Sequence, residues 1–405
     1  MSHLKSLSVI FFLGLLVWPT TTSFVGPDDP DWGFFAHRRI NRLAALTLPP
    51  EMMVFFKPNI DWVSDHATDA DMRRYATSWE APRHYMDLDT FGVYPFPDLP
   101  RNWSSALQLY TTVWGVGPAG DTVQILDSKT NWRPDFQDKY TVFFREFILP
   151  RYNEGDPTIN PDSLNAFLNQ FGKKMDLRDA FMKEDLTEHG ILPYNLYRMQ
   201  TRLTWAFRQL DAKQILRLSA DIGHYIGDAH VPLHTTSNYN GQKTNQHGIH
   251  GFWESRIPEL FADEEYDFFV GKPSYIEEKQ GYFWGIVLAS HLLVDSVLTL
   301  ERNLRVSFPD DRQMCPDMRN GRVVVAPCRE FAAAYQDAMD GMVERRMRAA
   351  IQSVASVWYT AWVDAGQPDL SKMLPINQSE ADAEAERLLK QSFESGKILG
   401  RPEEH

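Results

Sequence analysis

Five of the twelve histidines of this chain lie in one short stretch, from His224 to His250. His224 is followed four residues later by Asp228, and His250 is followed four residues later by Glu254. On a helix, residues four apart project from the same face, so each pair points an imidazole and a carboxylate in one direction. Zinc accepts both ligand types. Two such pairs together with His234 predict a preorganised metal site, so the chain must fold in a way that brings these segments together.

A single histidine–carboxylate pair also has an ordinary interpretation, as a satisfied polar contact on a half-buried helix. That interpretation weakens as pairs accumulate within one stretch of chain. The motifs of several other enzyme classes are absent, since the sequence contains no HExxH, no Walker A loop and no GxSxG. The residues therefore favour a metal site over a zincin protease, a P-loop nucleotide site or a serine hydrolase.

The spacing of apolar residues is helical over most of the chain from residue 32 onward, as in the run Ile215, Leu218, Ile222 and Ile226. Sustained alternation of apolar and polar residues is not seen. We therefore predict an all-α fold, a single large multi-helix domain over residues 24–365. Residues 90–160 are rich in Pro, Trp, Tyr and Asn and are expected to form a long irregular insertion. Residues 366–405 are expected to be a helical or disordered tail.

The chain has 405 residues, a formal net charge of -13 and 43% hydrophobic residues, which is the composition of a globular protein. Such an acidic chain lacks the broad basic face that neutralises the phosphates of a duplex. Stable duplex binding is therefore not expected, whereas cleavage of phosphate esters is compatible with this charge. We expect a monomer.

Residues 1–23 combine Lys5, an apolar run and small residues up to Ser23, which is the pattern of a secretory signal peptide. The apolar run is shorter than the ~20 residues that span a bilayer, so no integral membrane segment is expected in the mature form. A secreted or periplasmic protein is predicted. The only cysteines, Cys315 and Cys328, exclude a cysteine-based zinc cluster and form either one disulfide or two buried thiols.

Five segments, in this order and spacing, resemble the superfamily of zinc-dependent phospholipases C and S1/P1 nucleases. The resemblance extends from Trp32 to about residue 260 and implies an all-helical fold with three zinc ions. The segments are Trp32-Gly-Phe-Phe-Ala-His37, Asp71-Met-Arg-Arg74, His84-Tyr-Met-Asp87, His224-x3-Asp228-x5-His234 and His250-x2-Trp-Glu254.

The resemblance implies a ligand set for each ion. The first zinc would be held by Asp71, His84, His224 and Asp228. The second would be held by His234, His250 and Glu254. The third would take His37, the other oxygen of Asp228, and the backbone nitrogen and carbonyl of Trp32.

Two of these assignments have alternatives in the sequence. Asp65 and Asp69 lie in the same segment as Asp71, which is preferred from its place before Arg74. Cleavage after Ser23 would leave eight residues ahead of Trp32, whereas the superfamily uses a free N-terminal Trp as a ligand. Either processing occurs at Trp32 or the third zinc is bound differently.

By this resemblance the protein hydrolyses phosphodiester bonds, with Asp228 bridging two ions, Asp71 orienting the attacking water, and zinc activating that water. Glu254 and the short gap from His234 to His250 resemble the bacterial phospholipases, so a phospholipase C acting on phospholipid is favoured. The alternatives are an S1/P1-type nuclease acting on single-stranded RNA or DNA, and a non-catalytic, zinc-stabilised binding protein.

Overall fold

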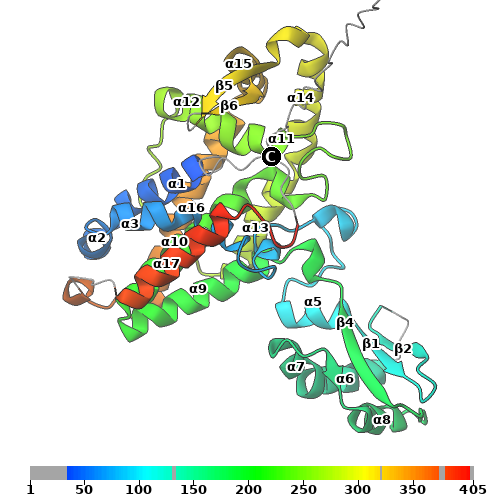
Figure 1. The fold of residues 1–405 in the computed structure, drawn as a ribbon. Coiled ribbons are helices and arrows are strands. Elements are labelled where there is room, and N and C mark those ends of the chain that lie inside the picture. Colours follow the sequence, from blue (N-terminus) through cyan, green and yellow to red (C-terminus); the bar gives the residue numbers. More distant parts are fainter. Residues whose placement is uncertain (1–33, 130–133, 320–321, 374–378, 402–405) are drawn as a thin grey trace, which may run out of the picture.

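The computed structural model describes residues 34–129, 134–319, 322–373 and 379–401. The expected signal peptide, residues 1–23, and Trp32 therefore lie outside the described residues. Most of the described chain is helical (Figure 1), which confirms the prediction of a predominantly helical fold.

The centre of the molecule is α10 (Ala212–His230), which packs against α9 (Leu192–Gln209), α16 (Met342–Asp364) and α1 (Phe34–Leu46). The Asp211 side chain caps α10 by accepting a hydrogen bond of 3.1 Å from the backbone N–H of Gln214. The helix ends at His230 because Pro232 follows, and the residue before a proline is disfavoured in the helical conformation. The apolar face predicted from the sequence is buried, with Ile215, Leu218, Ile222 and Ile226 in the main hydrophobic core.

Further helices, most of them short, lie around α1 and α10, and some of them contribute side chains to this core. They are α2 (Pro50–Phe56), α3 (Ile60–Asp65), η1 (His66–Thr68), α4 (Asp69–Arg73), η2 (Ala81–Arg83), η3 (Leu88–Thr90), η5 (Thr187–His189), η6 (Pro232–Thr235), α13 (Lys279–His291) and η9 (Leu370–Met373).

A second hydrophobic core lies beside the first and is formed mainly by helices from the C-terminal half. Its helices are α11 (Ile249–Gly251), the π-helix η7 (Phe252–Arg256), α12 (Ile257–Glu265), α14 (Val294–Ser307), α15 (Arg329–Ala338) and the first turns of α16. The short η8 (Asp310–Arg312) follows α14. The hairpin of β5 (Met314–Arg319) and β6 (Arg322–Pro327) precedes α15, and a disulfide joins Cys315 to Cys328 across its open end. Of the two alternatives for the cysteines, the disulfide is confirmed. It is mildly consistent with an extracellular protein.

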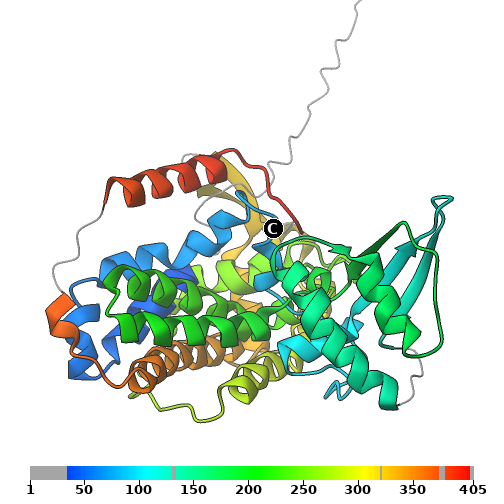
Figure 2. The ribbon, with the colours of Figure 1, turned by 90° about the horizontal axis from the view of Figure 1, so that it is seen from below.

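The prediction of an irregular insertion over residues 90–160 is wrong, and the sheet there departs from an all-α fold. The segment contributes to a small α+β unit with its own aromatic core, which stands to one side of the helical body (Figures 1 and 2). Its strands pair antiparallel in the order β2-β1-β4-β3. The elements are α5 (Trp103–Leu109), β1 (Thr111–Val116), β2 (Thr122–Asp127), α6 (Pro134–Phe143), the π-helix η4 (Phe144–Ile148), α7 (Leu149–Asn153), β3 (Thr158–Ile159), α8 (Pro161–Asn169) and β4 (Asp179–Glu184).

The last described helix, α17 (Glu380–Glu394), lies on the outside of the helical body and is followed by an extended segment (Figure 2). Ser379 and Asp382 form a capping box at its start. Among the described residues, one stretch, Lys279–Ser307, is long and apolar enough to cross a membrane, judged by length and composition alone. In the structure it consists of α13 and α14, and Val287 and Val297 on these helices are fully buried. Core helices of this kind meet the same criterion, so the finding is weak evidence for a membrane span.

Candidate metal centre

The structure brings eight of the nine predicted ligands together at one buried place, and the ninth, Trp32, lies outside the described residues. Asp228 and His224 lie one turn apart on α10, and both side chains are buried. The other ligands come from α1, α4, the end of η2, η6, and the α11–η7 segment, where they are His37, Asp71, His84, His234, His250 and Glu254. Residues more than 200 positions apart therefore meet around the C-terminal end of α10.

The first group of side chains surrounds one oxygen of Asp228. Asp228 Oδ2 lies 3.0 Å from His84 Nδ1 and 3.3 Å from His224 Nε2. Those two nitrogens are 3.1 Å apart. Asp71 Oδ1 completes the group at 3.6 Å from His84 Nδ1 and 3.5 Å from His224 Nε2. This set contains the four residues predicted for the first zinc.

The second group is centred on Glu254 in η7. Glu254 Oε2 lies 2.7 Å from His250 Nε2 and 3.3 Å from His234 Nε2. His234 Nε2 is also 3.9 Å from Asp228 Oδ1, so this group lies next to the first. His250 and Glu254 are four residues apart, as predicted.

His37 lies between the two groups. Its Nε2 atom is 3.4 Å from Asp228 Oδ1 and 3.2 Å from Glu254 Oε1. Asp228 and Glu254 each direct one oxygen to their own group and the other toward His37. The two carboxylates therefore link the three groups into one cluster.

The spacing of these atoms fits a metal site. Zinc holds nitrogen and oxygen ligands at about 2.0–2.1 Å in a tetrahedron, which separates neighbouring ligand atoms by about 3.3 Å. The separations around Asp228 Oδ2 run from 3.0 to 3.6 Å. His84 Nδ1 and His224 Nε2 face each other, and both face the same oxygen of Asp228. A cation bound between these three atoms would stabilise this arrangement. These buried groups could therefore hold metal ions.

The charges of the cluster depend strongly on one another. Burial acts to raise the pKa of Asp228, but the facing imidazoles of His224 and His234 outweigh burial and hold that pKa well below its usual value. In the same way, burial acts to raise the pKa of Glu254, but the His234 imidazole outweighs burial and holds that pKa well below its usual value. The pKa of Asp71 is also lowered, because His224 and His84 outweigh its burial. Three ionised carboxylates therefore lie within one buried site.

Two glycines on α10 allow α1 to approach closely enough to deliver His37. A methyl group added at Gly227 would lie 2.7 Å from His37 Nδ1, and one added at Gly223 would lie 1.9 Å from Asn41 Oδ1. A Cβ atom at either position would require the facing side chain to move. Sequence reasoning missed both, although their spacing of four residues on the same helix as His224 was a visible signal.

Glu80 is a second residue that sequence reasoning missed. It is buried behind His84, with its Oε1 atom 3.7 Å from His84 Nε2 on the side of the ring away from the cluster. Tyr225 donates a hydrogen bond to Glu80, and Arg83 forms an ion pair of 2.8 Å with it. Carboxylates in this position fix the orientation of metal-binding histidines. The signal was the placement of Glu80 four residues before His84.

The structure distinguishes among the three aspartates of the α3–α4 region. Only Asp71 reaches the cluster, whereas Asp69 Oδ2 lies 2.8 Å from His66 Nδ1 and Asp65 is exposed. The remaining histidines of the 224–250 stretch also lie elsewhere. The Nδ1–H of His230 donates to the backbone carbonyl of Ile226 at 2.7 Å, and His247 is exposed.

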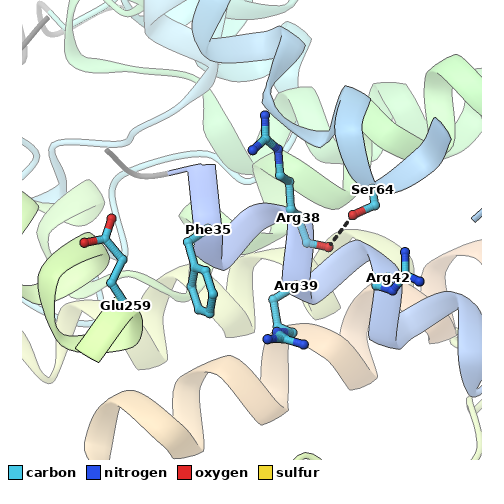
Figure 3. Close-up of a pocket in the computed structure, with 6 residues that line it drawn as sticks. All are labelled: Phe35, Arg38, Arg39, Arg42, Ser64 and Glu259. Atoms are coloured by element: carbon cyan, nitrogen blue, oxygen red, sulfur yellow. Dashed lines mark hydrogen bonds between the residues drawn. The ribbon is translucent and has the colours of Figure 1, made fainter. Parts of the chain in front are cut away.

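A pocket of about 410 Å³ opens beside α1 (Figure 3). Residues at positions 35, 38, 39 and 42 share one face of a helix, and His37 projects from the other. Arg39 and Arg42 are paired with Asp263 and Asp61. The lining residues are Phe35, Arg38, Arg39, Arg42, Ser64 and Glu259. This pocket is therefore separate from the metal centre.

No protein-family model matches the chain, and no curated protein matches its sequence. The interpretation of this site therefore depends on its geometry and on the chemistry of its side chains.

Proposed function

We propose that this protein is a zinc-dependent hydrolase of phosphodiester bonds, of the type found in the superfamily that its sequence resembles. The observation that carries the proposal is the convergence of five imidazoles and three carboxylates in one buried cluster, linked by Asp228 and Glu254. The proposal includes three zinc ions, one for each of the three linked groups, and the resemblance implies Trp32 as a further ligand of the third. The disulfide supports the related proposal that the protein acts outside the cytoplasm.

Bound zinc would supply Lewis acidity that activates water and neutralises charge on a phosphate group. The protein groups around the metal would position the ligands and orient the attacking water. Asp228, whose side chain is 2% exposed, contacts all three groups of ligands and would fix their positions relative to one another. Asp71 has a side chain that is 23% exposed, compared with at most 9% for the other seven, so it lies where a substrate enters. Its ionised carboxylate would orient the attacking water and accept a proton from it.

Phospholipid is the substrate class that we favour. Glu254, rather than an aspartate, and the short segment from His234 to His250 are the features that support a phospholipase C type. Cleavage of single-stranded RNA or DNA needs the same arrangement of groups and is the alternative outcome of the test. We propose that the protein acts as a monomer and does not bind duplexes stably.

The test offers zinc-loaded protein phosphatidylcholine, single-stranded RNA and single-stranded DNA together, and identifies the products by mass spectrometry. Phosphocholine and diacylglycerol would establish a phospholipase C, and 5′-nucleotides would establish an S1/P1-type nuclease. Asp71→Asn and His224→Ala should each abolish turnover. Asp65→Asn, which changes an exposed carboxylate in the same segment, should not.

A chelator should abolish turnover in every active sample. Full turnover by Asp71→Asn with zinc present would refute the assigned role of that residue. If zinc binds and no product forms from any substrate, the hydrolase proposal falls and a zinc-stabilised binding protein takes its place.

A further inference from the structure

The C-terminal segment of this chain follows α17 and continues over the outside of the helical body (Figures 1 and 2). Its backbone is attached to Arg74, because the N–H of Leu399 donates to the Arg74 carbonyl at 2.8 Å. The Arg74 side chain donates in turn to the carbonyl of Arg401 at 3.1 Å. Arg74 Nη1 is also 3.9 Å from Asp71 Oδ1, so the segment lies beside a predicted ligand.

The side chain of Arg401 occupies a cage of two aromatic rings and one carboxylate. Its guanidinium carbon lies 3.7 Å from the ring centre of Tyr239 and 4.1 Å from that of Tyr85. Nη1 of Arg401 is 2.8 Å from Asp87 Oδ1 and 3.0 Å from Asp87 Oδ2. Aromatic faces and a carboxylate are the groups that bind organic cations. We call Tyr85, Asp87 and Tyr239 the cation cage.

The cation cage is built from the same segments as the metal centre. Tyr85 follows His84 directly along the chain, and Asp87 lies three residues after His84. The Tyr239 ring is 6.4 Å from the His250 ring, centre to centre. The backbone between the two sites is shared as well, since the N–H of Met86 donates to the carbonyl of His234 at 2.9 Å. A group that fills the cage therefore lies beside the cluster, near the exposed edge of Asp71.

We propose that the cation cage is a binding site for an organic cation at the mouth of the metal centre, and that Arg401 is its internal, inhibitory occupant. The inhibitory part of this inference rests on the proposed function. The occupant is a guanidinium carried by the last described residues of the chain, so it competes with any external cation of the same kind. While Arg401 fills the cage, the segment from Leu399 restricts access to the Asp71 side of the cluster.

The attachment of the tail is suited to release. No residue of α17, which is described in full, is buried. The helix is held by a few surface contacts, among them the Phe393 ring, which lies 4.9 Å from the ring of Tyr75 and 5.8 Å from that of Phe34. Lys213 forms an ion pair of 2.6 Å with Asp382. An exposed ion pair of this kind contributes little to stability. The tail can therefore leave without disrupting either hydrophobic core.

The experiment compares the unchanged protein with Arg401→Ala and with the control Arg387→Ala, which removes an exposed arginine of α17 that pairs with Glu384 and Gln391 on the same helix. In the first measurement, each protein is titrated with methylguanidinium, and tyrosine fluorescence reports binding. We expect Arg401→Ala to bind this cation about tenfold more tightly than the other two proteins, because the cage is then open. Circular dichroism checks that all three are folded.

The second measurement is kcat/KM for bis(4-nitrophenyl) phosphate, a substrate without a cation. We expect Arg401→Ala to be more active by about tenfold, and saturating methylguanidinium to reverse part of the gain. Equal methylguanidinium binding by all three proteins would overturn the cage. If Arg401→Ala bound methylguanidinium more tightly but all three proteins had equal, measurable activity, only the inhibitory role of Arg401 would be overturned. Different binding with no activity in any protein would refute the proposed hydrolase and still support the cage.

Discussion

Single side chains in this cluster serve more than one partner. Asp228 uses Oδ2 for His84 and His224 and Oδ1 for His37, and Glu254 divides its two oxygens between His250 and His37 in the same way. The loss of one such carboxylate leaves several buried imidazoles without a counter-charge. Substitution of Asp228 is therefore expected to affect all three groups at once, whereas substitution of a histidine affects one.

Glu80→Gln tests whether the residue behind His84 tunes the metal site. Burial acts to raise the pKa of Glu80, but the nearby His84 imidazole and the charge of Arg73 outweigh burial and lower that pKa, so the carboxylate is ionised. Its replacement by a neutral amide should weaken zinc binding about 10- to 100-fold, since such partners orient the ligand ring. Competition with a chromophoric chelator measures this affinity. Glu51→Gln, at an exposed position, should bind zinc as the unchanged protein does, and equal affinity of both variants would exclude the role.

The residues of the cluster were predictable to different degrees. His224, Asp228, His250 and Glu254 were predictable because the helical period places residues four apart on one face. Asp71 was preferred over Asp65 and Asp69 from its place before Arg74, but only tertiary structure shows which of them reaches the cluster, because three carboxylates in one short segment have the same local chemistry. His230 belongs to the same histidine-rich stretch, yet it bonds to its own helix. Spacing alone does not reveal which side chains share a centre.

At the scale of helices, the contact between α1 and α10 determines where His37 lies. Gly227→Ala should displace the His37 ring by a few tenths of an ångström, because the new methyl group would lie 2.7 Å from Nδ1. We expect loss of one zinc ion per molecule and a decrease of about 1–3 kcal/mol in the free energy of unfolding. Metal analysis after gel filtration and urea denaturation measure the two effects.

Gly285→Ala is the matched control for that substitution. Gly285 also lies within a helix, α13, but no atom lies within 4 Å of an added methyl group. Alanine should leave the zinc content unchanged there and raise the free energy of unfolding by up to about 1 kcal/mol. If Gly227→Ala retained as much zinc as Gly285→Ala, the close contact would not be what positions His37.

The attachment of α17 should depend on pH through His66. Burial acts to lower the pKa of His66, but the hydrogen bond to Asp69 and the charges of Asp69, Glu386 and Asp65 outweigh burial and raise it. The Glu386 carboxylate on α17 lies 3.5 Å from His66 Nε2, and the His66 ring also stacks on Trp62. A raised pKa in the folded state means that His66 stabilises the protein fully below its unfolded pKa of about 6.5. That stabilisation is lost as the pH rises through the folded pKa.

His66→Gln should therefore lower the melting temperature relative to the unchanged protein at pH 5.5, with a smaller difference at pH 8.5. Thermal unfolding followed by circular dichroism at both pH values makes the comparison. A difference that is the same at both values would show that His66 acts through packing on Trp62 and not through its charge.

The elements show why prediction succeeded for the helices and failed for the sheet. A helix such as α10 repeats its pattern over several turns, so its period can be recognised. The strands of the insertion have at most six residues, and β1 pairs with β4, which lies about 70 residues further along the chain. Short strands with distant partners leave little local signal, and the prolines between them suggested irregular chain instead.

At the scale of the whole molecule, the candidate metal centre takes its ligands from elements that pack in both hydrophobic cores of the helical body. The main core holds α1 and α10, while the second core holds the π-helix η7 that carries Glu254. The cluster lies where these parts meet. A cation bound there would attach elements from both cores to each other, so metal binding should stabilise the fold as a whole and not only its own ligands.

Removal of metal should therefore lower the melting temperature of the entire protein in one cooperative step. Without cations, three ionised carboxylates remain buried among five imidazoles, and binding stabilises the folded state by about 4 kcal/mol when free zinc is a thousandfold above Kd. Differential scanning calorimetry with and without EDTA measures the change, and added zinc should restore it. Magnesium should not, because it prefers oxygen ligands. In Asp228→Asn the shift should be much smaller, since the carboxylate that links the groups is gone. An unchanged melting temperature after EDTA treatment would mean that the cluster is a polar core that needs no metal.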